Sequence, residues 1–247
     1  MVVAFSGGVD SALLAVAAHR ALPDRVWAVT AASASLASGE LDHCERFAAE
    51  HDLQWSSVGT HELDDERYLA NAGDRCYWCK SALMDELVPV AEQVGATVVL
   101  GVNVDDLGDH RPGQHAAAER GARFPLVDAG LRKDDIRALA KAWGLEVWDR
   151  PAMPCLSSRI PYQTPVTVGL LSRIDRAELV LRRLGFDDVR VRHYDDTARI
   201  EVPADRITEL AAVAPAVVPE LERIGYRYVT IDLAGLRTGN LNPALTT

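Results

Sequence analysis

The chain has 247 residues, 48% hydrophobic and 25% charged, the composition of a soluble globular protein whose core needs no disulfide staples. A formal net charge of −10 weighs against a protein whose main task is to bind a nucleic-acid backbone, so we expect no nucleic-acid partner. The sequence shows neither the features of a signal peptide nor a run of about 18 apolar residues, so we expect a cytoplasmic protein without a membrane span.

The first 150 residues alternate short apolar runs with helical patterns. Strands are predicted at Val2–Phe5, Arg25–Thr30, Gln54–Val58 and Thr97–Gly101, and helices at Asp10–Ala21, Gly39–His51, Ser81–Val94 and Lys133–Trp143. This alternation is typical of an α/β fold, an open and mostly parallel sheet with helices on both faces. We therefore predict one α/β domain over residues 1–150.

The composition changes after residue 150. Four prolines within about 16 residues predict a proline-rich interdomain loop over residues 151–169 without regular structure. The expected elements beyond it are helix Leu170–Leu184, strands Asp188–His193 and Ala198–Val202, a proline-interrupted helix Ile207–Ile224 and strand Tyr228–Leu233. This order predicts a small α+β domain over residues 170–247, for substrate binding or oligomerisation.

A glycine pair separates the first predicted strand from the first helix, at the place where backbone N–H groups and the helix dipole favour an anion. The serines beside it could donate hydroxyl hydrogens, and Asp10 could hold Mg²⁺. A serine-capped tight turn is the alternative interpretation. This run consists of Ser6, Gly7, Gly8, Val9, Asp10 and Ser11. It lacks the Walker and dinucleotide-binding patterns. It resembles the PP-loop of the ATP-pyrophosphatases (adenine nucleotide alpha hydrolase-like), enzymes that cleave ATP between the α and β phosphates.

Cys76 and Cys79 form a C-x-x-C pair, and Cys155 lies in the proline-rich loop. Such a pair can be a redox dithiol, half of a zinc site or part of an iron–sulfur site. The surroundings do not resemble thioredoxin, which weakens the redox interpretation. Zinc would need a further ligand such as Cys44 or His110, although Cys44 falls on the apolar face of a predicted helix and is expected in the core.

Several further strings are distinctive: RCYWCK (75–80), GVNVDDLGDHRPG (101–113), Pro125-Leu126 and PCLSSRIPY (154–162). With the phosphate loop they cover nearly the whole chain. They resemble the LarE family, pyridinium-3,5-biscarboxylic acid mononucleotide sulfurtransferases that help to make the nickel-pincer nucleotide cofactor. Val102 stands where a threonine is expected and Gln163 where a glycine is expected. Family members usually carry a short helix before the first strand, where this sequence begins.

The resemblance implies a cofactor set of ATP, Mg²⁺ and a [4Fe-4S] cluster. Family members with all three cysteines look like cluster-dependent sulfur carriers, so it implies cluster ligation by Cys76, Cys79 and Cys155. Members with only the cysteine that matches Cys155 sacrifice its sulfur and retain dehydroalanine. Cys155 is the key thiol in either mode. The partners that we expect are a nucleotide substrate, a sulfur donor and further copies of the chain in a homo-oligomer.

The reaction expected is adenylation of a substrate carboxylate, with pyrophosphate leaving into the phosphate loop, followed by attack of sulfur to give a thiocarboxylate. The phosphate loop and the Cys155 loop are expected to converge. Arg190 and Arg192 alternate on one strand face, so both could reach one anion; the resemblance implies a substrate phosphate, and a solvated edge is the alternative.

Other residues are assigned to the site with less specific reasons. Glu178 and Glu201 could bind metal near these arginines, and Trp78 could stack on a ring or simply pack. The residues after the strand Thr97–Gly101 stand where open sheets bind ligands, or else brace the loop. The site-loop candidates are Asp105, Asp106, Asp109, Arg111 and Arg159.

Three other functions remain open at this point. One is tRNA thiolation, against which the acidic balance and the missing RNA-binding appendage count. The second is an amide ligase like the NAD and GMP synthetases, which would need an ammonia source. The third is a non-catalytic nucleotide-binding module, which would have little reason to carry three cysteines beside the phosphate loop.

Overall fold

The computed structural model describes residues 1–108 and 112–237, which form two compact units. The first unit comprises Met1–Tyr68 and Asp74–Met153, and the second comprises Leu69–Gly73 together with the chain from Pro154 onward. The short segment Leu69–Gly73 thus belongs with residues far along the sequence, which no sequence pattern indicated.

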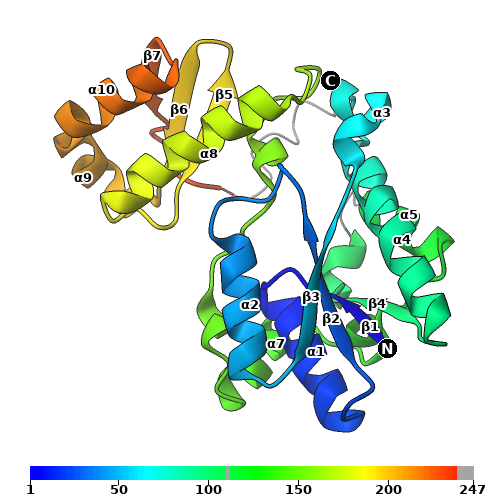
Figure 1. Ribbon diagram of the computed structural model, residues 1–247. Coiled ribbons are helices and arrows are strands. Elements are labelled where there is room, and N and C mark those ends of the chain that lie inside the picture. Colours follow the sequence, from blue (N-terminus) through cyan, green and yellow to red (C-terminus); the bar gives the residue numbers. More distant parts are fainter. Residues whose placement is uncertain (109–111, 238–247) are drawn as a thin grey trace. The chain divides into compact units, whose positions relative to one another are not determined.

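The first unit is built on a four-stranded parallel sheet in the order β3-β2-β1-β4 (Figure 1). Its strands are β1 (Val2–Ala4), β2 (Trp27–Ala32), β3 (Gln54–Gly59) and β4 (Val98–Leu100). Strands β1 and β4 are nearly all apolar, as expected of parallel strands that are covered on both faces. The α/β fold predicted from the sequence is confirmed.

Two apolar clusters cover the two faces of this sheet, and alternate residues of each strand supply them. On one face, Val3 and Val99 pack with residues of α1 (Val9–Ala21), α2 (Glu40–Glu50) and α7 (Lys133–Ala142). On the other face, Val2 and Val98 pack with α4 (Arg75–Gln93) and α5 (Pro112–Glu119). Figure 1 shows these two groups of helices on opposite sides of the strands.

Short elements complete the first unit. They are η1 (Glu62–Asp64), α3 (Glu66–Ala70), which runs into the second unit, η2 (Val104–Gly108), α6 (Pro125–Asp128) and η3 (Glu146–Asp149). The chain passes outward from β1 to β2 and β3 and then returns to place β4 on the other side of β1. The direction of winding therefore reverses between β1 and β4, and in open α/β sheets ligands bind at the carboxyl ends of such a strand pair.

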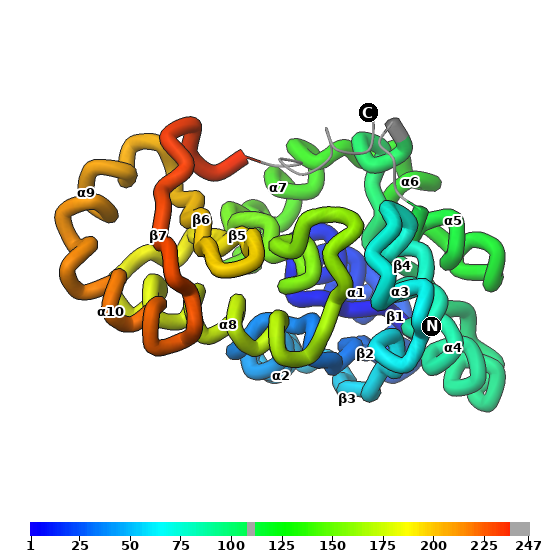
Figure 2. The backbone as a smooth tube through the Cα atoms, turned by 90° about the horizontal axis from the view of Figure 1, so that it is seen from above, coloured from blue at the N-terminus to red at the C-terminus, as the bar shows by residue number. Residues whose placement is uncertain are grey.

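The second unit packs α8 (Val168–Arg183), α9 (Ile207–Ala212) and α10 (Ala214–Ile224) against a three-stranded sheet (Figure 2). The sheet has the order β5-β6-β7, with β5 (Arg190–Tyr194) antiparallel and β7 (Tyr228–Ile231) parallel to β6 (Thr197–Glu201). Two 3-10 turns, η4 (Leu156–Arg159) and η5 (Ala204–Arg206), precede the helices α8 and α9. The α-β-β-α-β order matches the predicted α+β arrangement.

Asn71 anchors the segment Leu69–Gly73 within the second unit. Its amide nitrogen donates to the carbonyl oxygens of Pro161 at 2.8 Å and Thr164 at 3.0 Å, and the backbone N–H of Gln163 donates to the Asn71 carbonyl. This packing supports the proline-rich loop with residues from a distant part of the sequence. None of the helices in the described residues combines the length and apolar character that a membrane span requires.

Candidate functional site

The phosphate loop joins β1 to α1, and its first glycine is enclosed. Gly7 has φ +70°, and a Cβ atom there would lie 2.8 Å from His43 and 2.9 Å from the Sγ atom of Cys44, so only glycine fits. Gly8 is the N-cap of α1, and as a glycine it has no side chain to cap the first-turn N–H groups. These groups and the positive end of the helix dipole would favour an anion at the carboxyl end of β1.

The two serines of the loop contact each other. The Oγ atoms of Ser6 and Ser11 lie 3.1 Å apart, and the Ser11 hydroxyl donates to the Gly8 carbonyl at 3.0 Å. Ser11 therefore maintains the shape of the loop, while Ser6 is exposed and can also reach a ligand. At the end of β4, a Cβ atom on Gly101 would lie 2.7 Å from the backbone nitrogen of Ser11, so this glycine lets the two loops approach.

Asp10 is held by two donors from other elements. The Nζ atom of Lys133 donates to its Oδ2 at 2.6 Å, and the Nδ2 atom of Asn103 donates to its Oδ1 at 3.1 Å. Lys133 begins α7, and Asn103 follows β4. The carboxylate thus links the loops after β1 and β4, where the winding reverses. A Mg²⁺ ion at Asp10 would compete with the Lys133 ammonium for it.

Asp105 and Asp106 brace the loop after β4. Asp105 accepts the backbone N–H of Lys133 at 2.8 Å and the Nη1 atom of Arg132 at 2.9 Å, so it caps the start of α7. Asp106 accepts the backbone N–H of Asn103 at 3.1 Å. The bracing role weighed for these aspartates therefore has direct support. Three further candidates lie outside the described residues: Asp109, His110 and Arg111.

Cys76 and Cys79 lie in the first turns of α4, which begins at Arg75 and not at the predicted Ser81. The prediction was wrong here because the aromatic and polar run before Ser81 carries no apolar periodicity. Residues three apart in a helix share one side, so both thiols project on that side. Cys76 is exposed and Cys79 half-buried.

The other cysteines have different surroundings. Cys44 is fully buried in the core beneath the phosphate loop, as predicted, and burial raises the pKa of its thiol. A zinc site that uses Cys44 would have to open this core. Cys155 belongs to the second unit, where it is half-buried and is the N-cap of η4.

Trp78 is engaged within the first unit. The Cζ atom of Arg67 lies 3.6 Å from the centroid of its ring, and its Nε1 atom donates to Asp74 at 2.8 Å. The guanidinium therefore covers one face of the indole ring, which favours the packing role over stacking on a ligand.

Three buried arginines of the second unit differ in their partners. Arg159 makes a two-pronged contact with Glu178, from Nε at 2.8 Å and Nη2 at 3.1 Å. The Nε atom of Arg192 donates to Glu201 at 3.0 Å. Arg190 is 6% exposed and donates to the backbone carbonyl of Arg237, and within the described ranges no carboxylate forms an ion pair with it.

Arg190 is therefore a buried cation that forms no ion pair in the part of the chain that the structure describes, although the charges of Glu201 and Asp188 partly offset its own. Burial, followed by the charges of Arg159 and Arg192, lowers the pKa of its guanidinium. A buried guanidinium favours an anionic ligand, because pairing repays part of the desolvation cost. The arrangement is typical of a site for phosphate or carboxylate.

The two glutamates considered as metal ligands already hold arginines. Glu178 also accepts from Arg182 at 2.9 Å and from the backbone N–H of Val191 at 3.0 Å, and Glu201 accepts from Arg199 at 3.1 Å. Both carboxylates are fully buried. A metal would have to displace these donors, so the contacts favour a role in positioning arginines.

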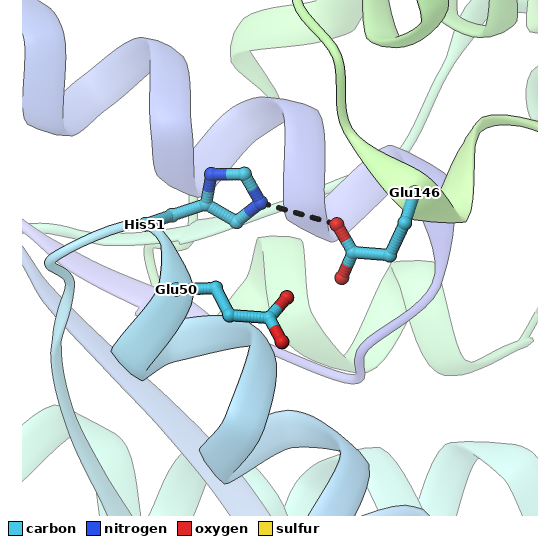
Figure 3. A group of neighbouring side chains, drawn as sticks. All are labelled: Glu50, His51 and Glu146. Carbon is cyan, nitrogen blue, oxygen red and sulfur yellow. Dashed lines mark hydrogen bonds and ion pairs between the residues drawn. The ribbon is translucent and has the colours of Figure 1, made fainter.

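Figure 3 shows three potential metal-binding side chains outside these sites: Glu50, His51 and Glu146. Their ligand atoms lie within 4.8 Å of one another, and this is the one such group among the residues with described positions. The group contains no cysteine and therefore adds no support to a zinc site on Cys76 and Cys79. The His51 Nε2 atom lies 3.2 Å from Glu146, which ties the end of α2 to η3.

Sequence reasoning missed Lys133, Arg150 and His43 near the phosphate loop. Lys133 carried a usable signal, because a lysine in the first turn of a helix faces the positive end of the dipole and is unfavourable without another purpose. Arg150 and His43 contact the carbonyl oxygen of Gly7, at 3.2 Å from Nη1 and 3.1 Å from Nε2. Both contacts join distant parts of the sequence, so no local pattern predicts them.

Comparisons with known proteins extend these observations. No family model matches the chain. An uncharacterized protein from Synechocystis sp. is 44% identical over 99% of this chain and 92% of its own length. Pyridinium-3,5-bisthiocarboxylic acid mononucleotide synthase from Lactiplantibacillus plantarum is 39% identical over 99% of this chain and 89% of the synthase. A component of the glutamine-hydrolyzing GMP synthase from Thermoplasma acidophilum is 28% identical over 71% of this chain and 62% of its own length.

Proposed function

The chain belongs to the LarE family, which includes the Lactiplantibacillus plantarum synthase, and from this premise we propose that it is an ATP-dependent sulfurtransferase. It adenylates a carboxylate of pyridinium-3,5-biscarboxylic acid mononucleotide and converts it to a thiocarboxylate, a step in nickel-pincer nucleotide biosynthesis. The observation that carries the proposal is the enclosed glycine loop between the ends of β1 and β4.

The first step activates the carboxylate. A carboxylate is a poor electrophile because its charge repels nucleophiles and oxide is a poor leaving group. Its oxygen attacks the α-phosphorus of ATP, and the bond to the β-phosphate oxygen breaks. The N–H groups of the loop and Lys133 stabilise the departing pyrophosphate. Asp10 is the residue that would hold Mg²⁺, which would neutralise charge on the phosphate oxygens, and Lys133 would then have to release this carboxylate.

The second step transfers sulfur. The sulfur attacks the activated carbonyl carbon, and the carbon–oxygen bond to AMP breaks. If Cys155 is the donor, its Cβ–Sγ bond then breaks as the Cα proton leaves, which gives the thiocarboxylate and dehydroalanine. A [4Fe-4S] cluster, when bound, would instead supply the sulfide.

Two of the three thiols fit such a cluster. Cys76 and Cys79 project from one side of α4 at exposed and half-buried positions, so one cluster could bind both. Cys155 is the third ligand in this proposal.

The buried arginines of the second unit bind the phosphate of the mononucleotide. Arg190 is the main candidate because it has no carboxylate partner in the described residues. Arg192 and Arg159 add positive charge beside it, while Glu201 and Glu178 hold these two in place.

The proposal is tested with anaerobically purified chain, ATP, Mg²⁺ and the biscarboxylic mononucleotide. Release of pyrophosphate and AMP and the mass of the product are measured for the wild type and for Cys155→Ala. We expect the variant to form the adenylate and release pyrophosphate but to make no thiocarboxylate. Cys44→Ala, which removes a core thiol, should retain both steps at reduced stability.

Other outcomes would revise or reject the proposal. Equal loss of both steps in Cys155→Ala would show that this thiol is misassigned. Iron and sulfide analysis separates the sulfur sources: about four irons per chain indicates the cluster, whereas colourless protein with zinc excludes it. Absence of pyrophosphate release with every carboxylate tested would favour a binding module.

A further inference from the structure

The carbonyl oxygen of Gly7 is held by two side chains that the reaction above does not use. One is His43, one turn into α2, and the other is Arg150, directly after η3. The imidazole Nε2 lies 3.1 Å from the oxygen, and the guanidinium Nη1 lies 3.2 Å from it. Two donors from separate elements thus converge on one atom of the phosphate loop.

Peptide geometry gives this contact a consequence for the anion site. The Gly7 carbonyl and the Gly8 N–H belong to one planar trans peptide group, so they point in opposite directions. Fixing the oxygen therefore fixes the direction of the N–H. Hydrogen bonds to the oxygen also polarise the peptide group and strengthen its N–H as a donor. Because glycine has few steric restrictions, this peptide would otherwise rotate easily.

Arg150 is itself held from several sides. Its Nη2 atom donates to Glu40 at 2.8 Å, and this carboxylate lies at the start of α2. The Nη1 and Nη2 atoms of Arg137 donate to the carbonyl oxygens of Trp148 and Arg150, at 3.2 and 3.4 Å. The guanidinium is therefore oriented before any ligand binds.

The group in Figure 3 anchors the other end of the same segment. Glu146 pairs with His51 at the end of α2, and the ring of His51 also lies against Phe47, with centroids 4.4 Å apart. Both ends of α2, about 16 Å apart for its 11 residues, therefore bind the segment from Glu146 to Arg150. The segment that carries Arg150 is therefore attached to α2 at two points.

We propose that Arg150 is a positioning residue which, together with His43, orients the Gly7–Gly8 peptide so that its N–H meets the departing pyrophosphate. This inference rests on the proposed function for the identity of the ligand. Arg150 acts through the peptide group and does not touch the phosphate itself.

The test compares the binding of Mg²⁺–pyrophosphate to the full chain and to Arg150→Met by calorimetry. Loss of the orienting hydrogen bond should weaken the affinity about tenfold. The amide ¹⁵N resonance of Gly8, which responds to hydrogen bonding at the preceding carbonyl, should shift in the ligand-free variant. Arg150→Lys keeps the charge but cannot bridge Gly7 and Glu40, so it should restore the affinity only in part. Arg20→Met removes an arginine that stacks on Trp143 and should change neither readout.

Three results would overturn the inference. In folded Arg150→Met, the affinity and the Gly8 resonance could both stay unchanged. The affinity could fall with an unchanged resonance and full rescue by Arg150→Lys, which would show that the charge alone matters. If Arg150→Met does not fold, Glu40→Ala removes the acceptor that anchors the guanidinium, and no effect on either readout would count equally against the idea. A wild type that binds pyrophosphate without adenylating substrate would refute only the proposed function.

Discussion

Individual arginines of the second unit have distinct roles that their ion pairs reveal. Arg159 and Arg192 form ion pairs with Glu178 and Glu201, whereas Arg190 donates to a backbone carbonyl and forms no ion pair in the described residues. Removal of one partner of a buried pair leaves a charge or donor uncompensated, but removal of a lone buried cation does not. Stability measurements can therefore test whether Arg190, unlike Arg159 and Arg192, is dispensable to the fold.

We predict opposite outcomes for two substitutions in this cluster. Glu178→Gln should lower the free energy of unfolding by about 3–5 kcal/mol, because Arg159 and Arg182 lose their carboxylate. Arg190→Met should cost at most about 1 kcal/mol while it weakens binding of the mononucleotide. Urea denaturation and calorimetry measure the two effects. Equal destabilisation by both changes would mean that Arg190 is structural.

Gln163 occupies a conformation that favours glycine. Its φ is +70°, which explains why a glycine was expected at this position, and an L-residue there costs about 1–2 kcal/mol. Gln163→Gly should therefore raise the free energy of unfolding. The net gain should be at most about 1 kcal/mol, because the more flexible glycine also increases the entropy of the unfolded chain. Gln54→Gly, on the exposed strand β3, is the matched control and should destabilise. A loss of stability in Gln163→Gly would contradict the strain argument.

Among the elements, the strands were easier to predict than the start of α4. Strands β1 and β4 are buried on both faces and read as continuous apolar runs, which is their signature in a parallel sheet. The first turns of α4 have no apolar stripe, and tertiary packing on α5 supports them. Gly113 makes this packing possible, because a Cβ atom there would lie 2.9 Å from the Cys76 carbonyl oxygen.

Gly113→Ala should therefore push α5 away from the cysteine pair. We expect a loss of about 1–3 kcal/mol of stability, measured by thermal unfolding, and less iron retained after anaerobic purification. Gly169 lies near the start of α8, where a Cβ atom would meet only the Thr167 hydroxyl at 3.9 Å, an ordinary contact, so Gly169→Ala should be neutral or stabilising. Similar effects of the two substitutions would show that the α4–α5 contact is not tight.

For the molecule as a whole, the sequence predicted the class of fold and the phosphate loop but not the loop's surroundings. The glycine pair was recognisable because few residues permit its backbone shape. The contacts of His43 and Arg150 with Gly7 depend on how α2 and η3 pack, over sequence separations of 36 and 143 residues. The packing of Leu69–Gly73 in the second unit is a contact of the same kind.

Ligand binding should act on the two units unequally. Every contact described for the phosphate loop lies within the first unit. Mg²⁺–pyrophosphate should therefore slow hydrogen exchange of the amides in α1 and α2, measured by mass spectrometry, while the core strands β5 and β6 keep their rates. The Asp10→Asn variant should show weaker protection. Equal protection of both units would argue that the anion binds elsewhere.

Because Leu69–Gly73 packs with the chain from Pro154 onward, the second unit is built from two segments that are far apart in the sequence. A fragment cloned from Pro154 onward would lack the Asn71 amide that caps the Pro161 and Thr164 carbonyls. A single cut before Pro154 would therefore produce a C-terminal fragment that lacks part of its own packing. Expression of the C-terminal half would need the missing pentapeptide grafted back, for example as a fused N-terminal extension.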